Sequence, residues 1–390
     1  MKNILDCTGH QLKIPNIIRS DGVYLFDSDE KRYMDLESGV WCAALGHKNR
    51  RINDAIKDQI DRIMHVGFCY SSEIVDSVAN SLLNLTNFES GKCVFLSSGS
   101  EAIEILRQIS RTLSGKEHKT LTLHDAYLGS YSSVIDREKN WYSFNWEKCE
   151  TCPSKNACDS SCKALLSIPE NISEFVFEPG SASGFVRFPP KALIKKIVSI
   201  VRKNKGKVIA NEVTTGIGRT GKWFGYQHYD IEPDMIAVGK GVGNGYPVSV
   251  AIVNKEIASE LQESSFDYMQ GHQNDPLAAA VVREVIQTIT DENLIEGARK
   301  KGVKFHAQLE SLVDGKVAIG IRGRGLMFAI DLASERITSK IYDDLIERGY
   351  IVCNRGSFLR IDPPLTIIEQ QFSEFVDALS CIIASNESFT

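Results

Sequence analysis

The chain has 390 residues, 45 of them basic and 50 acidic, which gives a formal net charge of −5. Such a length can bury a large core and suggests two domains, and the absence of a basic cluster argues against a nucleic-acid partner. Residues 1–10 lack the apolar core of a signal peptide, and no apolar run reaches the roughly 18 residues that span a membrane. We therefore expect a soluble, cytoplasmic protein with no membrane partner.

The first 45 residues predict a short β-rich arm. Asp21–Asp27 and Arg32–Asp35 have the composition of two hairpin strands around a turn at 28–31. The stretch GVWCAALGH follows and contains Trp41 and Cys42. Residues 51–64 then show helical apolar spacing.

A strand, a turn of small residues and a helix follow one another between residues 93 and 113. Cys93–Leu96 is apolar, SSGSE occupies 97–101, and a helical pattern covers Ala102–Leu113. Small residues at a helix start leave backbone N–H groups open to an anion, and the helix dipole favours negative charge there. The alternative is an ordinary helix start capped by Ser100.

Two further strands end at polar side chains. A predicted strand begins at Leu121 and leads to Tyr127 and Gly129, and Glu174–Phe177 predicts another strand that stops at Glu178. An amphipathic helix is predicted over Lys191–Asn204.

Four cysteines lie close together in the stretch between these strands. Their spacing is Cys-x2-Cys-x5-Cys-x3-Cys, in a segment of about 141–165 with little regular periodicity. Four thiolates at such spacing suit zinc or an iron–sulfur cluster in a structural role, and two disulfides or four free thiols are the alternatives. The predicted metal ligands are Cys149, Cys152, Cys158 and Cys162.

Residues 207–253 contain two short apolar runs with polar ends. Val208–Ala210 stops at Asn211, and Met235–Val238 stops at Gly239 and Lys240. Runs this short suit buried strands of a parallel sheet, and ligands bind at the carboxyl ends of such strands. Lys240 is therefore either a solvated lysine or a desolvated amine that forms a Schiff base with a carbonyl cofactor.

The last third of the chain predicts helices at 276–288, 291–312 and 339–348, with two strands within 317–332. The segment MQGHQNDPLAAA precedes the first helix, and SFLRIDPPL at 357–365 contains Arg360. A guanidinium fork binds a carboxylate with two hydrogen bonds. The alternative role for Arg360 is to satisfy carbonyls at a strand end.

Several of these motifs, in register, resemble those of class III aminotransferases, the fold-type I pyridoxal-phosphate (PLP) enzymes that include ornithine, acetylornithine and 4-aminobutyrate aminotransferases. The matching stretches run from about 22 to 365 and include NEVTTG at 211–216, GRTG at 218–221, PD at 233–234 and KGVGNGYP at 240–247. The resemblance implies an α/β fold: a large domain with a mainly parallel seven-stranded sheet, and a small α+β domain. We place residues 1–45 and 281–390 in the small domain and 46–280 in the large one.

The resemblance also implies a homodimer and a set of site residues. Lys240 is the expected catalytic residue and Schiff-base partner of PLP, and Trp41 and Arg360 are expected to bind substrate, although Trp41 also suits a domain-junction core. In relatives a threonine of the partner subunit contacts the phosphate. Here Gln270, His272 or Gln273 would supply that contact, with Gln273 as the chosen candidate and an interface turn as the alternative reading of the segment. The other expected cofactor contacts are Ser98, Gly99, Ser100, Tyr127, Glu178, Asn211, Val213 and Thr214.

Departures from the family pattern leave the reaction open. Asn211 replaces an aspartate that keeps the pyridine nitrogen protonated. Either the reaction avoids a fully developed carbanion, or the natural residue was replaced artificially. Thr214 replaces a glutamine, Leu128 a polar residue and Ser183 a glutamate that pairs with an arginine in some relatives. We expect amino-group transfer between an amine or amino acid and a 2-oxo acid. The alternatives are epimerisation, decarboxylation or amine migration on the same scaffold, or PLP binding with little turnover.

Overall fold

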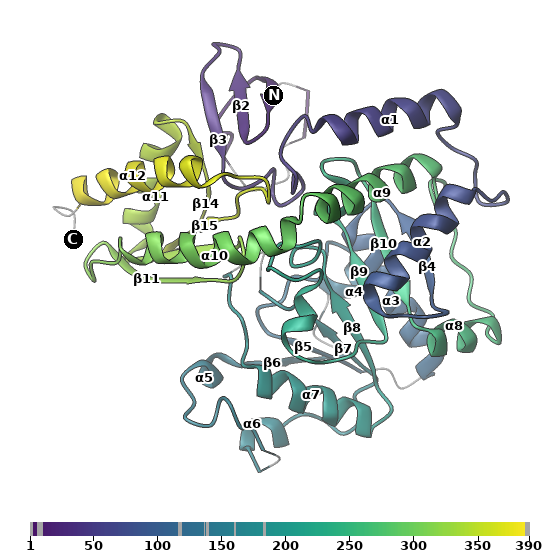
Figure 1. Cartoon of the computed structure of the whole chain (residues 1–390). Helices are drawn as coiled ribbons and strands as arrows, with labels where there is room; N and C mark the ends of the chain where they lie inside the picture. The colour runs from purple at the N-terminus through teal and green to yellow at the C-terminus, as the bar shows by residue number, and fades with distance from the viewer. Residues whose placement is uncertain are drawn as a thin grey trace.

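Figure 1 shows the computed structural model of the chain, which describes residues 3–5, 11–115, 119–135, 137, 140–159, 161–181 and 185–386. Its largest sheet has seven strands, and β10 runs antiparallel to both of its neighbours while the other pairs are parallel. The predicted α/β fold with a mainly parallel seven-stranded sheet is confirmed. The strand order is β4 (Lys92–Leu96), β10 (Ser249–Val253), β9 (Met235–Val238), β8 (Lys207–Asn211), β7 (Glu174–Phe177), β5 (Thr120–Leu123) and β6 (Trp141–Phe144).

The middle of this sheet is buried on both faces. Every residue of β7, β9 and β10 is buried, which explains why these strands are continuous apolar runs without alternation. Helices cover the sheet (Figure 1). Helices α2 (Glu73–Thr86), α3 (Gly99–Ser114) and α7 (Lys191–Lys203) pack on its strands, α8 (Lys255–Gln262) packs on α3, and α1 (Arg50–Arg62) packs on α9 (Pro276–Asp291). The short helix α4 (Ser132–Ile135) follows β5.

The start of α3 differs from its prediction. The helix begins at Gly99 rather than Ala102, because Ser98 is the N-cap and its side chain accepts a hydrogen bond from the Glu101 amide at 3.3 Å. Ser100 is therefore inside the first turn and is not the cap. The turn of small residues thus belongs to the helix terminus itself.

Two smaller sheets complete the fold. The predicted hairpin is present as β2 (Tyr24–Asp27) and β3 (Arg32–Asp35), joined by β1 (Ile17–Asp21), and β3 pairs in parallel with β13 (Tyr350–Ile351). This pairing brings the two ends of the chain together. The remaining sheet is antiparallel and contains β11 (Ala318–Gly323), β12 (Phe328–Leu332), β15 (Phe358–Ile361) and β14 (Cys353–Arg355).

The C-terminal helices match their predictions except at the ends. α9 is followed by α10 (Leu294–Glu310), and Asn293, at a φ of 49°, separates them. α11 (Glu335–Glu347) begins four residues before the predicted start because Ser334 caps it. The last helix, α12 (Glu369–Ser385), was not predicted. The domain boundaries at 45 and 280 stay a prediction.

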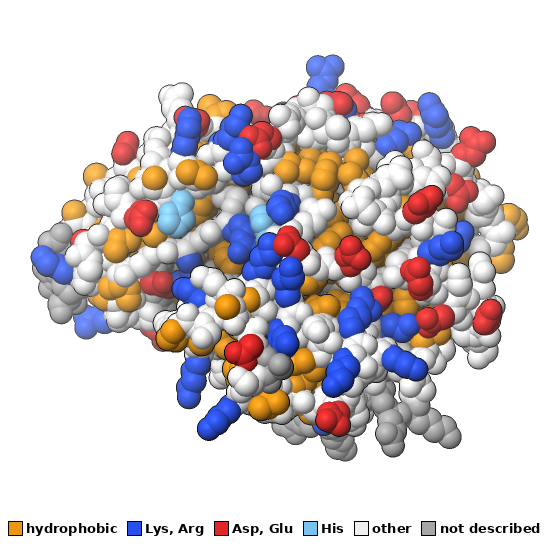
Figure 2. Space-filling view, turned by 60° about the horizontal axis from the view of Figure 1, so that its bottom comes forward, with side chains coloured by type: hydrophobic (Ala, Val, Ile, Leu, Met, Phe, Trp, Pro, Cys, Tyr) orange, Lys and Arg blue, Asp and Glu red, His pale blue; other side chains and the backbone are white. Residues whose placement is uncertain are grey.

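The surface is of mixed charge. On the face shown in Figure 2, acidic and basic side chains are interspersed around hydrophobic ones. Among the described residues, no helix combines the length and the apolar character that crossing a membrane requires.

Candidate active site

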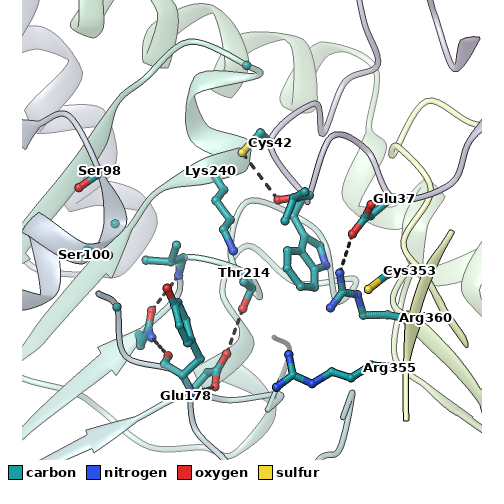
Figure 3. A pocket seen from close by; sticks show the side chains of 18 of the residues that line it. Glu37, Cys42, Ser98, Ser100, Glu178, Thr214, Lys240, Cys353, Arg355 and Arg360 are labelled. Atoms are coloured by element: carbon teal, nitrogen blue, oxygen red, sulfur yellow. Dashed lines mark hydrogen bonds and ion pairs between the residues drawn. The ribbon is translucent and has the colours of Figure 1, made fainter. Parts of the chain in front are cut away.

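A cavity of about 1360 Å³ lies at the edge of the seven-stranded sheet where β4, β7, β8 and β9 end. Figure 3 shows side chains that converge on it from the sheet and from the small antiparallel sheet. Parallel strands share one carboxyl edge, which is why residues far apart in the sequence meet there. The predicted residues that line the cavity are Trp41, Ser98, Gly99, Ser100, Tyr127, Glu178, Asn211, Val213, Thr214, Lys240 and Arg360.

Lys240 opens the short 3-10 helix η2 (Lys240–Gly243) directly after the end of β9. Its φ is 46°, an unfavourable left-handed conformation for a residue with a side chain, and such strain concentrates at functional sites. Its Nζ atom lies 4.3 Å from the centroid of the Trp41 ring. Burial lowers the pKa of Lys240 below its ordinary value, which increases the fraction of neutral, nucleophilic amine.

The start of α3 forms another wall of the cavity through Ser97, Ser98, Gly99 and Ser100. A Cβ atom on Gly99 would lie 2.6 Å from Cγ1 of Val213, so only glycine fits between the helix start and that side chain. The Ser100 hydroxyl accepts a hydrogen bond from the Ser130 amide at 3.1 Å. The first turn of a 16-residue helix thus faces the cavity without bulky side chains, an arrangement that suits a phosphate.

Asn211, only 4% exposed, uses both ends of its amide to join two chain segments. Its Nδ2 atom donates to the carbonyl of Tyr127 at 2.8 Å, and its Oδ1 atom accepts from the Val213 amide at 3.2 Å. The reverse orientation would place donor against donor and acceptor against acceptor, so the bonding pattern fixes the amide. Asparagine therefore ties the end of β8 to the Tyr127 segment, which an aspartate could not do.

Glu178 holds the same segment from the other side. It is 2% exposed, its Oε2 atom accepts from the Tyr127 amide at 2.8 Å, and its Oε1 atom accepts from the Thr214 hydroxyl at 3.4 Å. The side chain of Tyr127 itself is half exposed and lines the cavity. Its ring is thus presented to a ligand by a backbone that is bonded on both sides.

Arg360 is buried and already engages carboxylates of the protein. Its Nε atom donates to Asp362 at 2.8 Å and its Nη2 atom to Glu37 at 3.0 Å, and its guanidinium lies 3.7 Å from the centroid of the Trp41 ring. Burial raises the pKa of Glu37, and the positive charge of Arg360 opposes this rise. An incoming carboxylate would therefore compete with Glu37 for the guanidinium.

The cavity also contains residues that the sequence did not single out: Glu37, Cys353 and Arg355. Cys353 lies opposite Arg360 in the β14–β15 pair. Alternation along the short hairpin around Gly356 is the signal that could have placed 353 and 355 on one face. Burial raises the pKa of the Cys353 thiol to about 11 and also raises the pKa of Cys42, which lines the same cavity, so both thiols are protonated at neutral pH.

Gln273 is not among the residues that line this cavity. The backbone N–H of Gln273 donates to the backbone carbonyl of Gln270 at 3.2 Å, in the turn before α9. The predicted contact with a partner subunit's cofactor stays a prediction. The metal-ligand role of the four clustered cysteines also stays a prediction, and Ser183 lies outside the described residues.

The residues around the cavity fit PLP. A desolvated lysine can bond an aldehyde, the start of α3 can hold a phosphate, and Tyr127 and Val213 can contact the two faces of a pyridine ring. Gly99, where a Cβ would meet Val213, keeps the space for close approach. Fold and cavity together define a fold-type I PLP enzyme.

Comparison with known proteins agrees. The family model "Aminotransferase class-III" matches residues 8–383. An acetylornithine aminotransferase from Aquifex aeolicus is 29% identical over 375 residues, covering 94% of this chain and 96% of that protein. A leucine/methionine racemase from Thermococcus litoralis is 27% identical over 404 residues, covering 95% of this chain and 90% of that protein.

The fold also matches solved structures. A taurine:2-oxoglutarate aminotransferase from Bifidobacterium kashiwanohense, solved with PLP and glutamate, superposes with a TM-score of 0.90 at 21% identity, covering 99% of this chain and 96% of the other. The chain belongs to the class III aminotransferases. It is a PLP-dependent aminotransferase, as the sequence motifs predicted.

Proposed function

We propose that this aminotransferase exchanges an amino group between an amine or amino acid and a 2-oxo acid, and that Lys240 is the residue that carries PLP. The observation that supports this role is the position of one buried amine, with a lowered pKa, in the cavity that also contains the start of α3 and Asn211. Ser98, Gly99 and Ser100 are proposed to hold the phosphate.

The side chains divide the remaining work. PLP, when bound, supplies an electron-accepting ring. The neutral amine of Lys240 is suited to move the proton on the substrate carbon that bears the nitrogen. Arg360 would orient the substrate carboxylate, and Trp41, in contact with both Lys240 and Arg360, would exclude water between them.

Glu37 is proposed to stand in for a carboxylate at Arg360. A substrate with a carboxylate would displace Glu37 from Nη2, whereas a simple amine would leave the 3.0 Å pair intact. Binding of both substrate types in one cavity would then need no movement of the backbone. This role explains why a carboxylate with a raised pKa lies in the cavity.

We further propose that the protein is a homodimer. Large apolar side chains are exposed near the turn before α9, including Met64, Phe68, Tyr70 and Met269. His65 and Asp275 are in contact, which places the segment after α1 beside this turn. A second copy of the chain that covered this surface would bury the apolar groups and would bring Gln273 toward the partner's cavity.

The proposed compartment is the cytoplasm. All nine cysteines in the described part of the chain are unpaired, which suits a reducing environment.

Racemisation is the second candidate. The racemase among the relatives shares the fold and nearly the whole chain length. Asn211 supplies a neutral group where relatives are expected to have a carboxylate. A racemase needs no amino acceptor, so dependence on an added 2-oxo acid distinguishes the two reactions.

The experiment combines covalent mapping with activity. The full chain is loaded with PLP, reduced with borohydride and mapped by mass spectrometry, and the unreduced enzyme is assayed with a panel of amino acids, with and without 2-oxo acids. We expect the label on Lys240 and product only when a 2-oxo acid is present. Optical inversion of an amino acid without acceptor would favour the racemase.

Lys240→Ala supplies the matching loss of function, and Lys301→Ala is the control. Lys301 is another lysine whose pKa is lowered by burial, but its amine bonds the carbonyl of Ile367 at 2.8 Å, outside the cavity. The Lys240 variant should lose the label while the Lys301 variant keeps it. A label on a different lysine in the wild type would refute the assignment.

A further inference from the structure

The four clustered cysteines lie in a small insert whose middle part, from Thr151 to Ala164, has no buried apolar side chain among its described residues. The insert contains only short elements, among them α5 (Glu147–Glu150) and α6 (Lys163–Leu166). Between Thr151 and Ala164, every described residue is exposed except Cys152, Cys158 and Cys162. The segment therefore turns its thiols inward and everything else outward, and it lacks the buried apolar area that would keep a loop ordered.

The four thiols share one neighbourhood. Cys149 lies in α5 and Cys162 precedes α6, and together with Cys158 they pack against the same hydrophobic core. The thiol of Cys149 is close enough to those of Cys152, Cys158 and Cys162 to interact with all three. None of the four forms a disulfide. Four unpaired thiols gathered in one segment are a ligand set that suits a thiolate-bound metal centre.

The spacing of the sulfurs distinguishes between metal centres. A tetrahedral zinc ion with bonds of about 2.3 Å needs its sulfurs roughly 3.8 Å apart. Among the described residues, no three of the clustered sulfur atoms lie within 4.8 Å of one another. The group of potential ligands that does meet this limit is His65, His272 and Asp275, outside the insert. A cubic iron–sulfur cluster holds its four cysteine sulfurs farther apart, because each ligates a different iron.

We propose that Cys149, Cys152, Cys158 and Cys162 together bind a four-iron iron–sulfur cluster. The cluster supplies the interior that the insert lacks. Its ligands come from one continuous segment, so the site is complete within one chain. Lys148, Lys155 and Lys163 are close in sequence to the thiolates and provide positive charge around the anionic centre.

The insert is connected to the active site. Trp146, three residues before Cys149, donates to Asp125 at 2.8 Å, and the carbonyl of Asp125 accepts from Ser181 at 3.1 Å. Asp125 lies two residues before Tyr127 in the segment that lines the cavity. Arg187 bonds both carboxylate oxygens of Glu150 at 3.0 and 2.9 Å. The cluster thus orders a segment that supports Tyr127, while taking no part in the reaction itself.

Metal analysis of the full chain tests this proposal independently of aminotransferase activity. The protein is purified without oxygen, and iron, zinc and acid-labile sulfide are measured per chain, with electron paramagnetic resonance after reduction by dithionite. We expect about four irons and four sulfides per chain and a signal from the reduced cluster. Visible absorbance is avoided because bound PLP absorbs in the same range.

Alanine replacements locate the ligands. Each of the four insert cysteines is changed singly, and Cys69→Ala and Cys381→Ala, at exposed positions outside the insert, are the matched controls. We expect iron and sulfide to fall in each insert variant and to stay at the wild-type level in the controls, with circular dichroism showing that the variants are folded. Where a single variant is unfolded, the wild-type thiols are alkylated before and after iron removal. The four insert cysteines should react only after the iron is removed.

Three results would overturn the proposal. The first is a protein that stays below one iron per chain after reconstitution with iron and sulfide. The second is zinc in place of iron, and the third is the same iron content in insert and control variants.

Discussion

Replacing Asn211 by aspartate separates the structural role of this side chain from its role beside the cofactor. In the structure, the amide donates from Nδ2 to the Tyr127 carbonyl at 2.8 Å and accepts at Oδ1 from the Val213 amide. A carboxylate can keep the second bond and must lose the first. It would also face the Tyr127 carbonyl oxygen with a negative charge, at a position that is 4% exposed.

The magnitude follows from the lost bond. A buried acceptor left without its donor costs about 1–3 kcal/mol, and more when a charge is involved. We therefore expect the cofactor-free Asn211→Asp variant to be less stable than the wild type by about that amount. With PLP bound, the new carboxylate gains a cationic partner if the ring nitrogen is protonated, so part of the lost stability should return.

The assay is urea unfolding of the wild type and the variant, each with and without PLP, with Asn244→Asp as the control. Asn244 has the same bonding pattern, because its Oδ1 accepts from the Leu45 amide at 2.7 Å and its Nδ2 donates to the Gly46 carbonyl at 3.1 Å. PLP should stabilise the Asn211 variant more than the wild type and should stabilise the control variant no more than the wild type. We also expect an added amine to change the absorbance of bound PLP faster in the Asn211 variant.

Two outcomes would refute this reasoning. If the cofactor-free Asn211→Asp variant is as stable as the wild type, the bond to Tyr127 contributes nothing. If PLP stabilises both proteins equally and the amine reacts no faster, the side chain at 211 does not govern the charge of the ring.

Three further predictions concern the walls of the cavity. Gly99→Ala should cost about 1–3 kcal/mol of stability, because the new Cβ atom would lie 2.6 Å from the side chain of Val213. Adding Val213→Ala to this variant should recover much of the lost stability. Equal urea midpoints for Gly99→Ala and the wild type would contradict this prediction. Glu37→Gln should lower KM for substrates with a carboxylate, because the side chain at position 37 that competes for Arg360 loses its charge. An unchanged KM would argue against this competition. Because the pKa of Glu37 is raised in the native state, the native state binds more protons than the unfolded state at pH values just above 4.5. The stability of the wild type therefore falls as the pH rises from 4.5 through the raised pKa. The stability of the Glu37→Gln variant should fall less steeply over the same pH range.

Much of the fold could be predicted from local patterns. The runs at 174–177 and 235–238 are short, apolar and bounded by turn residues, and they are the strands β7 and β9. Helix ends were less accurate, because a cap depends on which hydroxyl reaches a free amide. Ser98 rather than Ser100 does so at α3, and Ser334 starts α11 earlier than the apolar pattern suggests.

The site divides in the same way. Asn211 and Lys240 were predictable because Asn211 ends one buried strand, Lys240 comes two residues after the end of another, and parallel strands present their carboxyl ends together. Glu37 was missed because its importance comes from a 3.0 Å pair with Arg360, 323 residues away. No local pattern reports a contact of that separation.

By itself, the sequence determined the family, the sheet and the lysine at its edge, because strand burial and turn chemistry are written in neighbouring residues. Only the tertiary structure decided how those groups are used. It showed that Asn211 is bonded at both ends, that Arg360 already has carboxylate partners, and that the clustered cysteines face inward while their neighbours face solvent. Hydrogen-bond partners and burial depend on segments distant in the chain, and only folding brings those segments together.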